Sequence, residues 1–465
     1  MYQLREAVRR GSINLKNYPS GFQPPPLRTG EEYKKLLSPC IRETSEAERV
    51  SLSLLGLKLG CTRCVCKQAS THSLARAFLA NLTHYSLKII LMQNNSRAFE
   101  AMMALLRAGL WQQPVVQYAA NASESSEKLF PLSADEWESI YSIACEQAVA
   151  GVVWQGVTLL PQECMPPQSL VVRWVAHVDA IERRNAQLDD ILGSLLIIYR
   201  ARGVDPILLK GHTAALLYPD PHLRQSGDFD FYFPNPKWRE IADNIAREAG
   251  CVLSTSADGS TVFSWGGVTI EHHSRLFDLQ RPKSVKIVRP IVEGIEKLCL
   301  SLSINNDFKV RALAPYPNLL LLNTHILKHS LGRGVGLRQF CDIALAYSAS
   351  CRDVDGVRMK SLYRSLGLGC WCSLLHSFLV QWMGLPQEAL PWNDGLVDAT
   401  PLMRIVQRGG NFGQHAGQDN EKGALARKGD TALSFLRNIG FCIRYAPGEA
   451  YYTFWQLLKG QCKRQ

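Results

Sequence analysis

The stretch Gly227-Asp-Phe-Asp-Phe-Tyr-Phe233 gives the clearest indication of fold in this chain of 465 residues. Its alternation has the two-residue period of a β-strand, in which successive side chains point to opposite faces of a sheet. The three phenylalanines are therefore expected to enter a core, whereas Asp228 and Asp230 share the opposite face. Two carboxylates this close repel each other unless a cation lies between them. The strand therefore predicts a metal-binding pair.

The surroundings of this pair matter, because a D-x-D pair alone also fits the solvated face of an edge strand. A short apolar strand ends at Lys210-Gly211, and a short helix follows whose first N–H groups, up to Thr213, can bind an anion. Lys210 and Arg224 add positive charge ahead of the acidic strand. Gly227 allows a phosphate to approach the backbone. Together these residues favour a triphosphate site over a solvated edge.

A third carboxylate lies further along the chain. Residues 261–265 and 268–273 predict two strands of a hairpin, joined by the turn Gly266-Gly267. Glu271 is on the second strand, and His273 shares its face because the two are two residues apart. Acidic residues on two strands beside a glycine turn predict phosphoryl transfer assisted by two metal ions.

In combination these segments resemble a known family, the uncharacterised nucleotidyltransferases of the DNA-polymerase-β-like superfamily. The resemblance covers Met92 to the C-terminus and excludes the preceding residues. The segments that carry it are Leu208-Leu-Lys-Gly211, Tyr218-Pro-Asp-Pro221, Arg224, Gly227-Asp-Phe-Asp230, Glu271-His-His273-Ser-Arg275-Leu, His325 and Leu337-Arg-Gln-Phe-Cys-Asp342.

The resemblance implies an α+β fold. A polymerase-β-like palm, which is a small mixed sheet with helices, would be flanked by N-terminal helices and a helical C-terminal region. It also implies an enzyme that moves a nucleoside monophosphate from an NTP to a hydroxyl group, while pyrophosphate leaves. Asp228 and Asp230 would bind both Mg²⁺ or Mn²⁺ ions, and Glu271 would be a third ligand or the base for the attacking hydroxyl.

One feature departs from the superfamily pattern. Its members usually carry Gly-Ser close ahead of the D-x-D pair, whereas here Gly211-His-Thr213 is followed by a longer spacer. Lys210 and Arg224 are therefore expected to replace that motif in binding phosphates. Three further polar residues are expected to line the cleft, namely His273, His325 and Arg338.

Changes in composition predict four regions. Residues 1–91 hold 14 Lys and Arg against six Glu, and the first Asp of the chain is Asp135. We interpret residues 1–91 as a poorly ordered basic extension, with the alternative that Met92 is the native start. The three remaining regions are a helical one at 92–203, the palm at 204–290 and a helical one at 291–465.

Cys370 and Cys372 are expected on a buried helix.

Composition also bears on location and partners. Hydrophobic residues make up 46% and charged residues 20%, as in soluble globular proteins. No apolar run reaches the roughly 18 residues of a membrane span, and the start lacks the apolar stretch of a secretory signal. These features predict a cytoplasmic protein without a membrane segment.

The net charge of +11 raises the prospect of a nucleic-acid partner. Because most of that excess belongs to residues 1–91, the remainder of the chain does not indicate one. The acceptor stays open between a small molecule, a protein and an RNA.

Two other functions remain open. The first is a catalytically inactive module of the same fold that binds nucleotide or has a regulatory role. Metal-dependent NTP binding without release of pyrophosphate would indicate it. The second is an RNA-binding protein driven by charge, whose affinity would fall steeply with salt.

Overall fold

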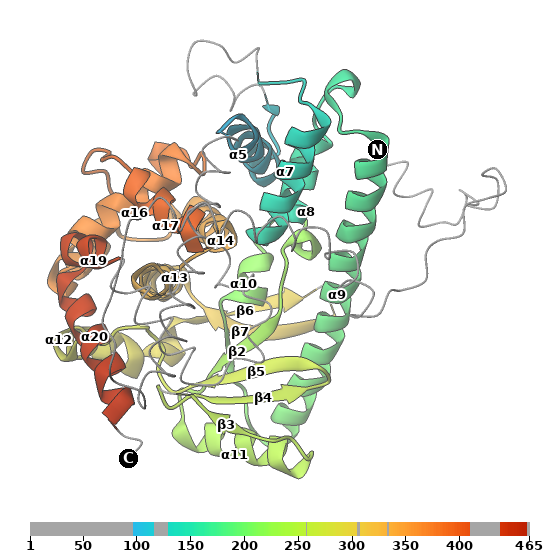
Figure 1. Ribbon diagram of the computed structural model, residues 1–465. Helices are drawn as coiled ribbons and strands as arrows, with labels where there is room; N and C mark the ends of the chain where they lie inside the picture. Colours follow the sequence, from blue (N-terminus) through green and yellow to red (C-terminus); the bar gives the residue numbers. More distant parts are fainter. Residues whose placement is uncertain are drawn as a thin grey trace, which may run out of the picture. The chain divides into compact units, whose positions relative to one another are not determined.

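The computed structural model describes residues 96–115, 129–256, 258–304, 307–332, 334–409 and 438–462. In these residues a seven-stranded sheet lies between the long helix α9 (Gln168–Ala201) and a group of helices that includes α13 (Pro315–Leu331), as Figure 1 shows. The fold is α+β, as predicted. The expected basic extension, residues 1–91, lies outside the described residues.

The sheet has the strand order β3-β4-β5-β2-β1-β7-β6. At its centre β2 runs parallel to β5 and antiparallel to β1, so the sheet is mixed, as expected of a palm. The predicted hairpin is formed by β4 and β5. The strands are β1 (Ile207–Leu209), β2 (Asp228–Tyr232), β3 (Ser254–Thr255), β4 (Thr261–Trp265), β5 (Val268–His273), β6 (Cys299–Ile304) and β7 (Phe308–Leu313).

Helices precede the sheet in the chain. One of them, α7, begins at a capping box, in which Ser133 and Glu136 exchange hydrogen bonds between side chain and backbone. Asn235 caps α11 in a similar way, with proline at the first helical position. Besides α9, the helices that precede β1 are α5 (Ser96–Trp111), α7 (Ala134–Glu146), α8 (Ala150–Val157) and η4 (Gln162–Cys164). Those that lie between the first three strands are α10 (Gly211–Ala215), η5 (Pro221–Leu223) and α11 (Pro236–Glu248).

The remaining helices form the C-terminal region. Among the described helices, none combines the length and apolar character that crossing a bilayer requires. These helices are α12 (Pro282–Glu293), η6 (Ile295–Leu298), α13, α14 (Leu337–Ser350), α15 (Gly356–Leu366), α16 (Gly369–Gln381), η7 (Gln387–Ala389), α17 (Thr400–Gly409), α19 (Ile439–Tyr445) and α20 (Pro447–Cys462).

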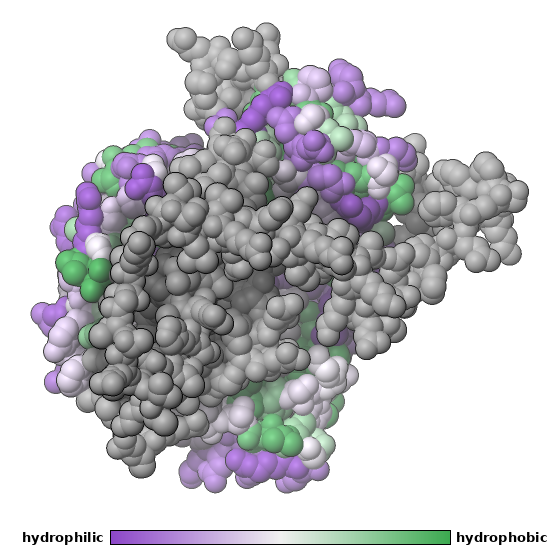
Figure 2. Space-filling view, viewed as in Figure 1, coloured by the Kyte–Doolittle hydropathy of each residue, from purple (hydrophilic) through white to green (hydrophobic). Residues whose placement is uncertain are grey.

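The face of β2 that carries the phenylalanines packs against α9 and α11. Phe229, Phe231 and Phe233 are buried in one cluster with Leu192 of α9 and Ile245 of α11. The outer side of α11, at the bottom of Figure 2, is hydrophilic. Each buried phenylalanine stabilises the fold by about 3–5 kcal/mol relative to alanine, so β2 cannot turn over. The aromatic residues thereby fix Asp228 and Asp230 on the other face, as predicted.

Strands β6 and β7 correct the expectation that the chain is helical after residue 290. Residues 299–304 and 308–313 alternate apolar and polar side chains, which is the pattern of a strand with one buried face. They pair as an antiparallel hairpin, and β7 adds to β1. The sheet therefore extends beyond the palm range 204–290 to Leu313.

Helix α8 lies very close to the segment that precedes β2. A Cβ atom at Gly151 of α8 would lie 2.5 Å from the carbonyl oxygen of Leu223. Real Cβ atoms do not approach an oxygen this closely, so only glycine fits without movement of the backbone. Gly151 thus sets the distance between the N-terminal helices and the segment that leads to Asp228.

We predict that Gly151→Ala destabilises the protein by about 1–3 kcal/mol, because the added methyl group overpacks this contact. The urea midpoint of unfolding, followed by circular dichroism, measures the change. Gly440→Ala is the matched control, since a Cβ at this exposed position in α19 meets no atom within 4 Å. The control should stabilise the helix by about 0.5–1 kcal/mol. Equal effects of the two substitutions would contradict the close approach.

Candidate active site

The pairing of β2 with β5 brings the predicted acidic residues together. Asp230 lies opposite Glu271 in the parallel ladder, and Asp228 lies opposite Thr269. Residues that are paired across neighbouring strands project from the same face of a sheet. Asp228, Asp230 and Glu271 therefore share the face that is turned away from α9 and α11. The predicted convergence of carboxylates from two strands is present in the structure.

Asp230, Glu271 and His273 form the centre of this site. His273 Nε2 lies 2.6 Å from Asp230 Oδ1, and His273 Nδ1 lies 3.5 Å from Glu271 Oε1. One ligand atom from each of the three residues can be chosen so that all lie within 4.8 Å of one another. In the described part of the chain this group meets the geometric requirement for holding a metal ion. His273, predicted only to line the cleft, is thus placed among the candidate ligands.

Lys210 is the cation closest to this centre. Its Nζ lies 3.3 Å from Asp230 Oδ1 and 3.4 Å from His273 Nε2, and the side chain is buried. Burial would lower the pKa of Lys210, but the negative charges of Asp230 and Asp278 raise it to about 12. The lysine is therefore charged at neutral pH and compensates the acidic cluster.

The carboxylates differ in their ease of ionisation. Burial would raise the pKa of Asp230, but the charge of Lys210 and the hydrogen bond from His273 outweigh burial and hold the pKa well below its ordinary value. Burial raises the pKa of Glu271. Desolvation and repulsion from Asp230 also raise the pKa of Asp228, although its side chain is open to solvent. A divalent cation would favour the ionised form of all three.

The turn that carries Lys210 has an unusual backbone. Lys210 has φ 50° and ψ −137°, which is close to the first central position of a type II′ turn, where glycine is preferred. A side chain held in such a region costs about 1–3 kcal/mol, and this kind of strain gathers at functional sites. The strained turn aims the lysine at Asp230.

The anion site expected at the following helix is small. Helix α10 spans only the five residues Gly211–Ala215, so its dipole is slight. The hydroxyl group of Thr213 donates to the carbonyl oxygen of Lys210 at 2.7 Å and so caps the turn. Gly211 lies near Arg224, another predicted phosphate-binding residue, since a Cβ there would be 4.0 Å from Arg224 Nη1. Gly227 has open space around it, which is consistent with ligand approach.

Arg224 is buried in an ion pair with α14. Its Nε and Nη2 donate to the two carboxylate oxygens of Asp342 at 2.8 and 2.7 Å. The hydroxyl group of Tyr218 donates to the same carboxylate at 2.7 Å. These contacts join the palm to the C-terminal helices. Phosphate binding by Arg224 stays a prediction, and the structure adds that its guanidinium also fixes the segment before β2.

Arg338 enters the site from the start of α14. Its Nη1 donates to the carbonyl oxygen of Gln225, two residues before Gly227. The positive charge of Arg338 lowers the pKa of Asp228, against the larger effects of desolvation and of Asp230. The predicted place of Arg338 beside the acidic strand agrees with this geometry.

Two polar residues of α9 make hydrogen bonds to α10 and to the segment before β2. Asn185 Nδ2 donates to the carbonyl oxygens of His222 and Arg224 at 2.6 and 2.8 Å. One turn later, Asp189 accepts from His212 Nε2 at 2.7 Å and from His222 Nε2 at 2.9 Å. These four contacts connect α9, α10 and η5. Sequence reasoning missed both residues, although two buried polar side chains in the apolar stripe of a helix are a usable signal.

Strand β5 is fixed from its other side by a buried histidine. His272 points away from the acidic cluster, and its Nδ1 donates to Asp243 Oδ1 at 2.6 Å. Its Nε2 then accepts from the hydroxyl group of Tyr199 at 2.9 Å. Burial lowers the pKa of His272, which keeps the ring neutral and able to make both bonds. The neighbours Glu271 and His273 are thereby held on the site face.

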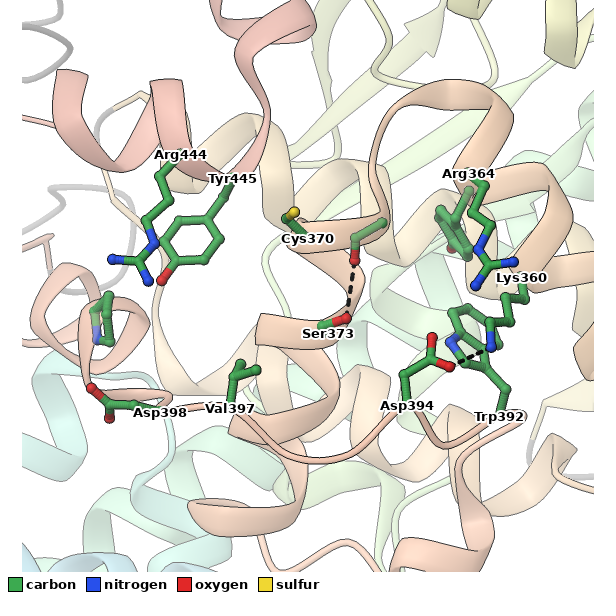
Figure 3. A pocket seen from close by; sticks show the side chains of 13 residues that line it. Lys360, Arg364, Cys370, Ser373, Trp392, Asp394, Val397, Asp398, Arg444 and Tyr445 are labelled. Carbon is green, nitrogen blue, oxygen red and sulfur yellow. Dashed lines mark hydrogen bonds and ion pairs between the residues drawn. The ribbon is translucent and has the colours of Figure 1, made fainter.

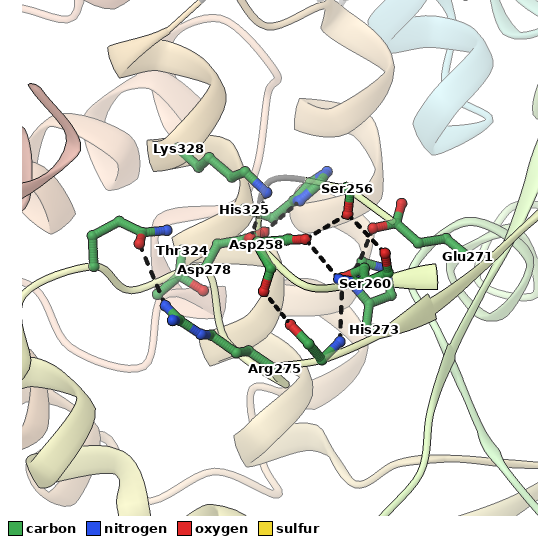
Figure 4. A network of polar contacts seen from close by, with 12 residues as sticks. Ser256, Asp258, Ser260, Glu271, His273, Arg275, Asp278, Thr324, His325 and Lys328 are labelled. Carbon is green, nitrogen blue, oxygen red and sulfur yellow. Dashed lines mark hydrogen bonds and ion pairs between the residues drawn. The ribbon is translucent and has the colours of Figure 1, made fainter. Parts of the chain in front are cut away.

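A second polar group, missed apart from His325, joins α13 to the segment between β5 and α12. Asp278 Oδ2 lies 3.0 Å from His325 Nδ1, and Lys328 Nζ donates to Asp278 Oδ1 at 2.6 Å. Figure 4 shows His325 and Lys328 pointing from α13 toward the strand that bears Glu271. Burial and the charge of Lys210 lower the pKa of His325 to about 4. The ring of His325 is therefore neutral at pH 7, and its role in lining a cleft stays a prediction.

Comparison with known proteins agrees with this geometry. A family model described as an uncharacterised nucleotidyltransferase matches residues 133–384, which is more than half of the chain. The matched range contains every residue of the site described above. No curated protein and no solved structure matches the chain.

We predict that Lys210→Gly is more stable than Lys210→Met by about 1 kcal/mol. Both substitutions remove the charge, but only glycine relaxes the strain at φ 50°, and its greater freedom in the unfolded chain offsets part of that gain. Thermal unfolding of the two variants measures the difference. Equal stability, or a more stable methionine variant, would show that the turn is unstrained.

We also predict that His325 makes the protein less stable in mild acid. The unfolded chain binds a proton at His325 below about pH 6.5, whereas the folded state resists protonation down to about pH 4. Stability is therefore lost as pH falls between these values. From pH 7 to pH 5 the loss from this group should be about 1–2 kcal/mol.

Urea unfolding of the wild type and of His325→Gln at both pH values measures this contribution together with its effect on His329, whose pKa is lowered by burial and by the charge of His325. The variant should lose less stability on acidification than the wild type. A loss of the same size in both proteins would mean that His325 is not buried as a neutral ring.

Proposed function

The chain belongs to the uncharacterised nucleotidyltransferase family, and we propose that it moves a nucleoside monophosphate from an NTP to a hydroxyl group of an acceptor with the help of divalent cations. The observation that carries this proposal is the gathering of Asp230, Glu271 and His273 within 4.8 Å, with Asp228 on the same face. Carboxylate oxygens are the ligands that Mg²⁺ and Mn²⁺ favour.

The donor set fits such an ion on physical grounds. Burial raises the pKa values of Asp228 and Glu271, and repulsion from Asp230 adds to this rise, so a cation bound between these carboxylates would stabilise their ionised forms. Lys210 supplies one positive charge beside three carboxylates. Bound Mg²⁺ or Mn²⁺ would supply the missing charge and polarise the phosphate oxygens. We propose Asp228, Asp230 and Glu271 as its ligands, with His273 as an additional one.

The residues of the site suit the proposed transfer. The acceptor oxygen would attack the α-phosphorus, a new P–O bond would form, and the bond to the pyrophosphate oxygen would break. If Glu271 does not bind the ion, we propose it instead as the base that accepts the proton of the hydroxyl group, since its raised pKa makes the carboxylate a better base. Lys210, Arg224 and Arg338 supply positive charge near Asp228, where we place the triphosphate of the NTP.

We predict that Asp230→Asn lowers the rate of transfer by about 100-fold or more, because it removes charge where the phosphoryl group reacts. The assay combines the full chain with each NTP labelled at the α-phosphate, with Mg²⁺ or Mn²⁺ and a cell extract. Release of pyrophosphate and labelling of an acceptor are measured together. The size class of the labelled product separates a small molecule from a protein or an RNA.

Asp190→Asn is the matched control, because this carboxylate is exposed on α9, away from the acidic cluster. It should leave the rate unchanged. Labelling that is equal in the wild type and in Asp230→Asn would remove the proposed role of the cluster. Metal-dependent NTP binding without release of pyrophosphate would instead identify an inactive nucleotide-binding module. RNA binding that depends steeply on salt, with neither activity, would identify the charge-driven alternative.

A further inference from the structure

A cavity lies in the C-terminal helical region, on elements other than those that carry the acidic cluster. It has a volume of about 480 Å³ and lies between α15, α16, α17, α19 and the segment 391–398 (Figure 3). This volume is within the range of small-molecule sites, which is roughly 300–1,000 Å³. None of the residues that carry the proposed transfer lines this cavity.

Aromatic side chains provide much of its wall. Trp392, Tyr363 and Tyr445 line the cavity, and the rings of Tyr363 and Trp392 lie 5.8 Å apart. The hydroxyl group of Tyr363 is buried and has no hydrogen-bond partner among the described residues. Flat apolar walls of this kind bind planar rings by burial and by ring contacts.

The charges at the rim leave an excess of positive charge. Asp394 is paired with Lys360, and Asp398 accepts from the backbone of Thr400 at the start of α17. In the described part of the chain, neither Arg364 nor Arg444 has a carboxylate within ion-pairing distance. Figure 3 shows these two arginines on opposite sides of the cavity. Arginines without a direct ion pair at the rim of a cavity favour an anionic ligand.

The N-terminus of α16 adds to this preference. Gly369 and Cys370, in its first turn, line the cavity. The N-cap residue Leu368 provides no side-chain hydrogen bond, so the first N–H groups of this 13-residue helix lack a side-chain cap. Such groups bind anions well.

The predicted burial of Cys370 is wrong, because its side chain is exposed, whereas Cys372 is buried as expected.

The cavity is also only partly covered by the family match. The matched range ends at residue 384, whereas Trp392, Asp394, Arg444 and Tyr445 lie beyond it. A site for the NTP, the substrate that the family name implies, is expected inside the matched range. A cavity with half of its wall outside that range fits a ligand that is specific to this chain.

We propose that this cavity binds a small organic anion that carries a planar ring, such as an aromatic carboxylate or an aryl phosphate. Trp392 and Tyr445 lie on opposite sides of the cavity (Figure 3), so the ring lies against one of them, and the anionic group meets the arginine on that side, Arg364 or Arg444, and the first turn of α16. This site is separate from the proposed transfer site, and the proposal holds whether or not the chain transfers nucleotides.

The exposed thiol of Cys370 allows a direct test on the full chain. The protein is treated with iodoacetamide in the presence of 4-nitrophenyl phosphate, and alkylation of each cysteine is followed by peptide mass spectrometry. A saturating probe should slow alkylation of Cys370 about tenfold, in proportion to occupancy. Cys251, which is half-buried and does not line the cavity, should react at an unchanged rate.

Two further probes separate the parts of the ligand. Inorganic phosphate carries the charge without the ring, and 4-nitrophenol carries the ring with much less charge. Both should protect Cys370 less than 4-nitrophenyl phosphate does at the same concentration. Equal protection by either one would overturn the combined requirement for ring and anion. No protection by 4-nitrophenyl phosphate would overturn the site.

Variants of the arginines link protection to the proposed contacts. Of Arg364→Met and Arg444→Met, the variant that removes the arginine in contact with the anionic group should weaken protection by the aryl phosphate about tenfold or more, since a charge-assisted hydrogen bond is lost. Arg404→Met is the matched control, because this exposed arginine of α17 does not line the cavity. It should leave protection unchanged. Full protection in both rim variants would exclude binding through these arginines.

Discussion

Repulsion between carboxylates on one sheet face is the constraint to which the rest of the molecule responds. Asp230 and Glu271 lie side by side in the β2–β5 ladder, and Asp228 is two residues away. Nothing in the packing of β2 itself requires acidic residues there. The structure keeps them charged and close by setting Lys210 against Asp230 in a strained turn. Repulsion between the carboxylates and backbone strain at Lys210 both lower the stability of the folded protein. Such unfavourable features are typical of a site that is organised to bind a ligand.

Hydrogen bonds from neighbouring helices hold the strands that carry this charged centre. Behind β5, Tyr199 and Asp243 hold His272 by two hydrogen bonds. Before β2, Asp342 of α14 holds Arg224, and α9 holds the same segment through Asn185. These supports are buried and polar, so each contact has a specific geometry that apolar packing alone would not impose. The carboxylates keep their mutual positions because three helices, α9, α11 and α14, are hydrogen-bonded to their strands or to the segment before β2.

Much of this arrangement could be predicted from local sequence patterns. The alternation around Phe229 and Phe231 fixed the strand and its two faces, and the double glycine at 266–267 marked the hairpin that brings Glu271 to Asp230. Strands β6 and β7 were not predicted, although they alternate as clearly, because each is only six residues long and they lie between segments with helical periodicity. A six-residue alternation between apolar and polar residues can indicate a strand even where the adjacent segments have helical periodicity.

Contacts between distant segments could not be predicted in the same way. The ion pair of Arg224 with Asp342 joins residues 118 positions apart, and no local pattern encodes it. The group formed by Asp278 and Lys328 with His325 is of the same kind. The cavity between α15 and α19 also depends on how helices pack, which explains why Cys370 appeared to be an ordinary buried residue. Local periodicity determines elements and faces, whereas tertiary packing determines partners.

The length of α9 has a consequence for how this fold can vary. The first half of the helix packs among the N-terminal helices through Trp174 and Val178, and the second half packs beneath the sheet through Leu192 and Tyr199. One inserted residue between the halves would rotate one against the other by about 100°. Asn185 and Asp189 would then point elsewhere, and both hydrophobic faces would lose their register. Homologous chains can therefore change the length of their loops freely, but they are expected to lengthen this helix only at its ends.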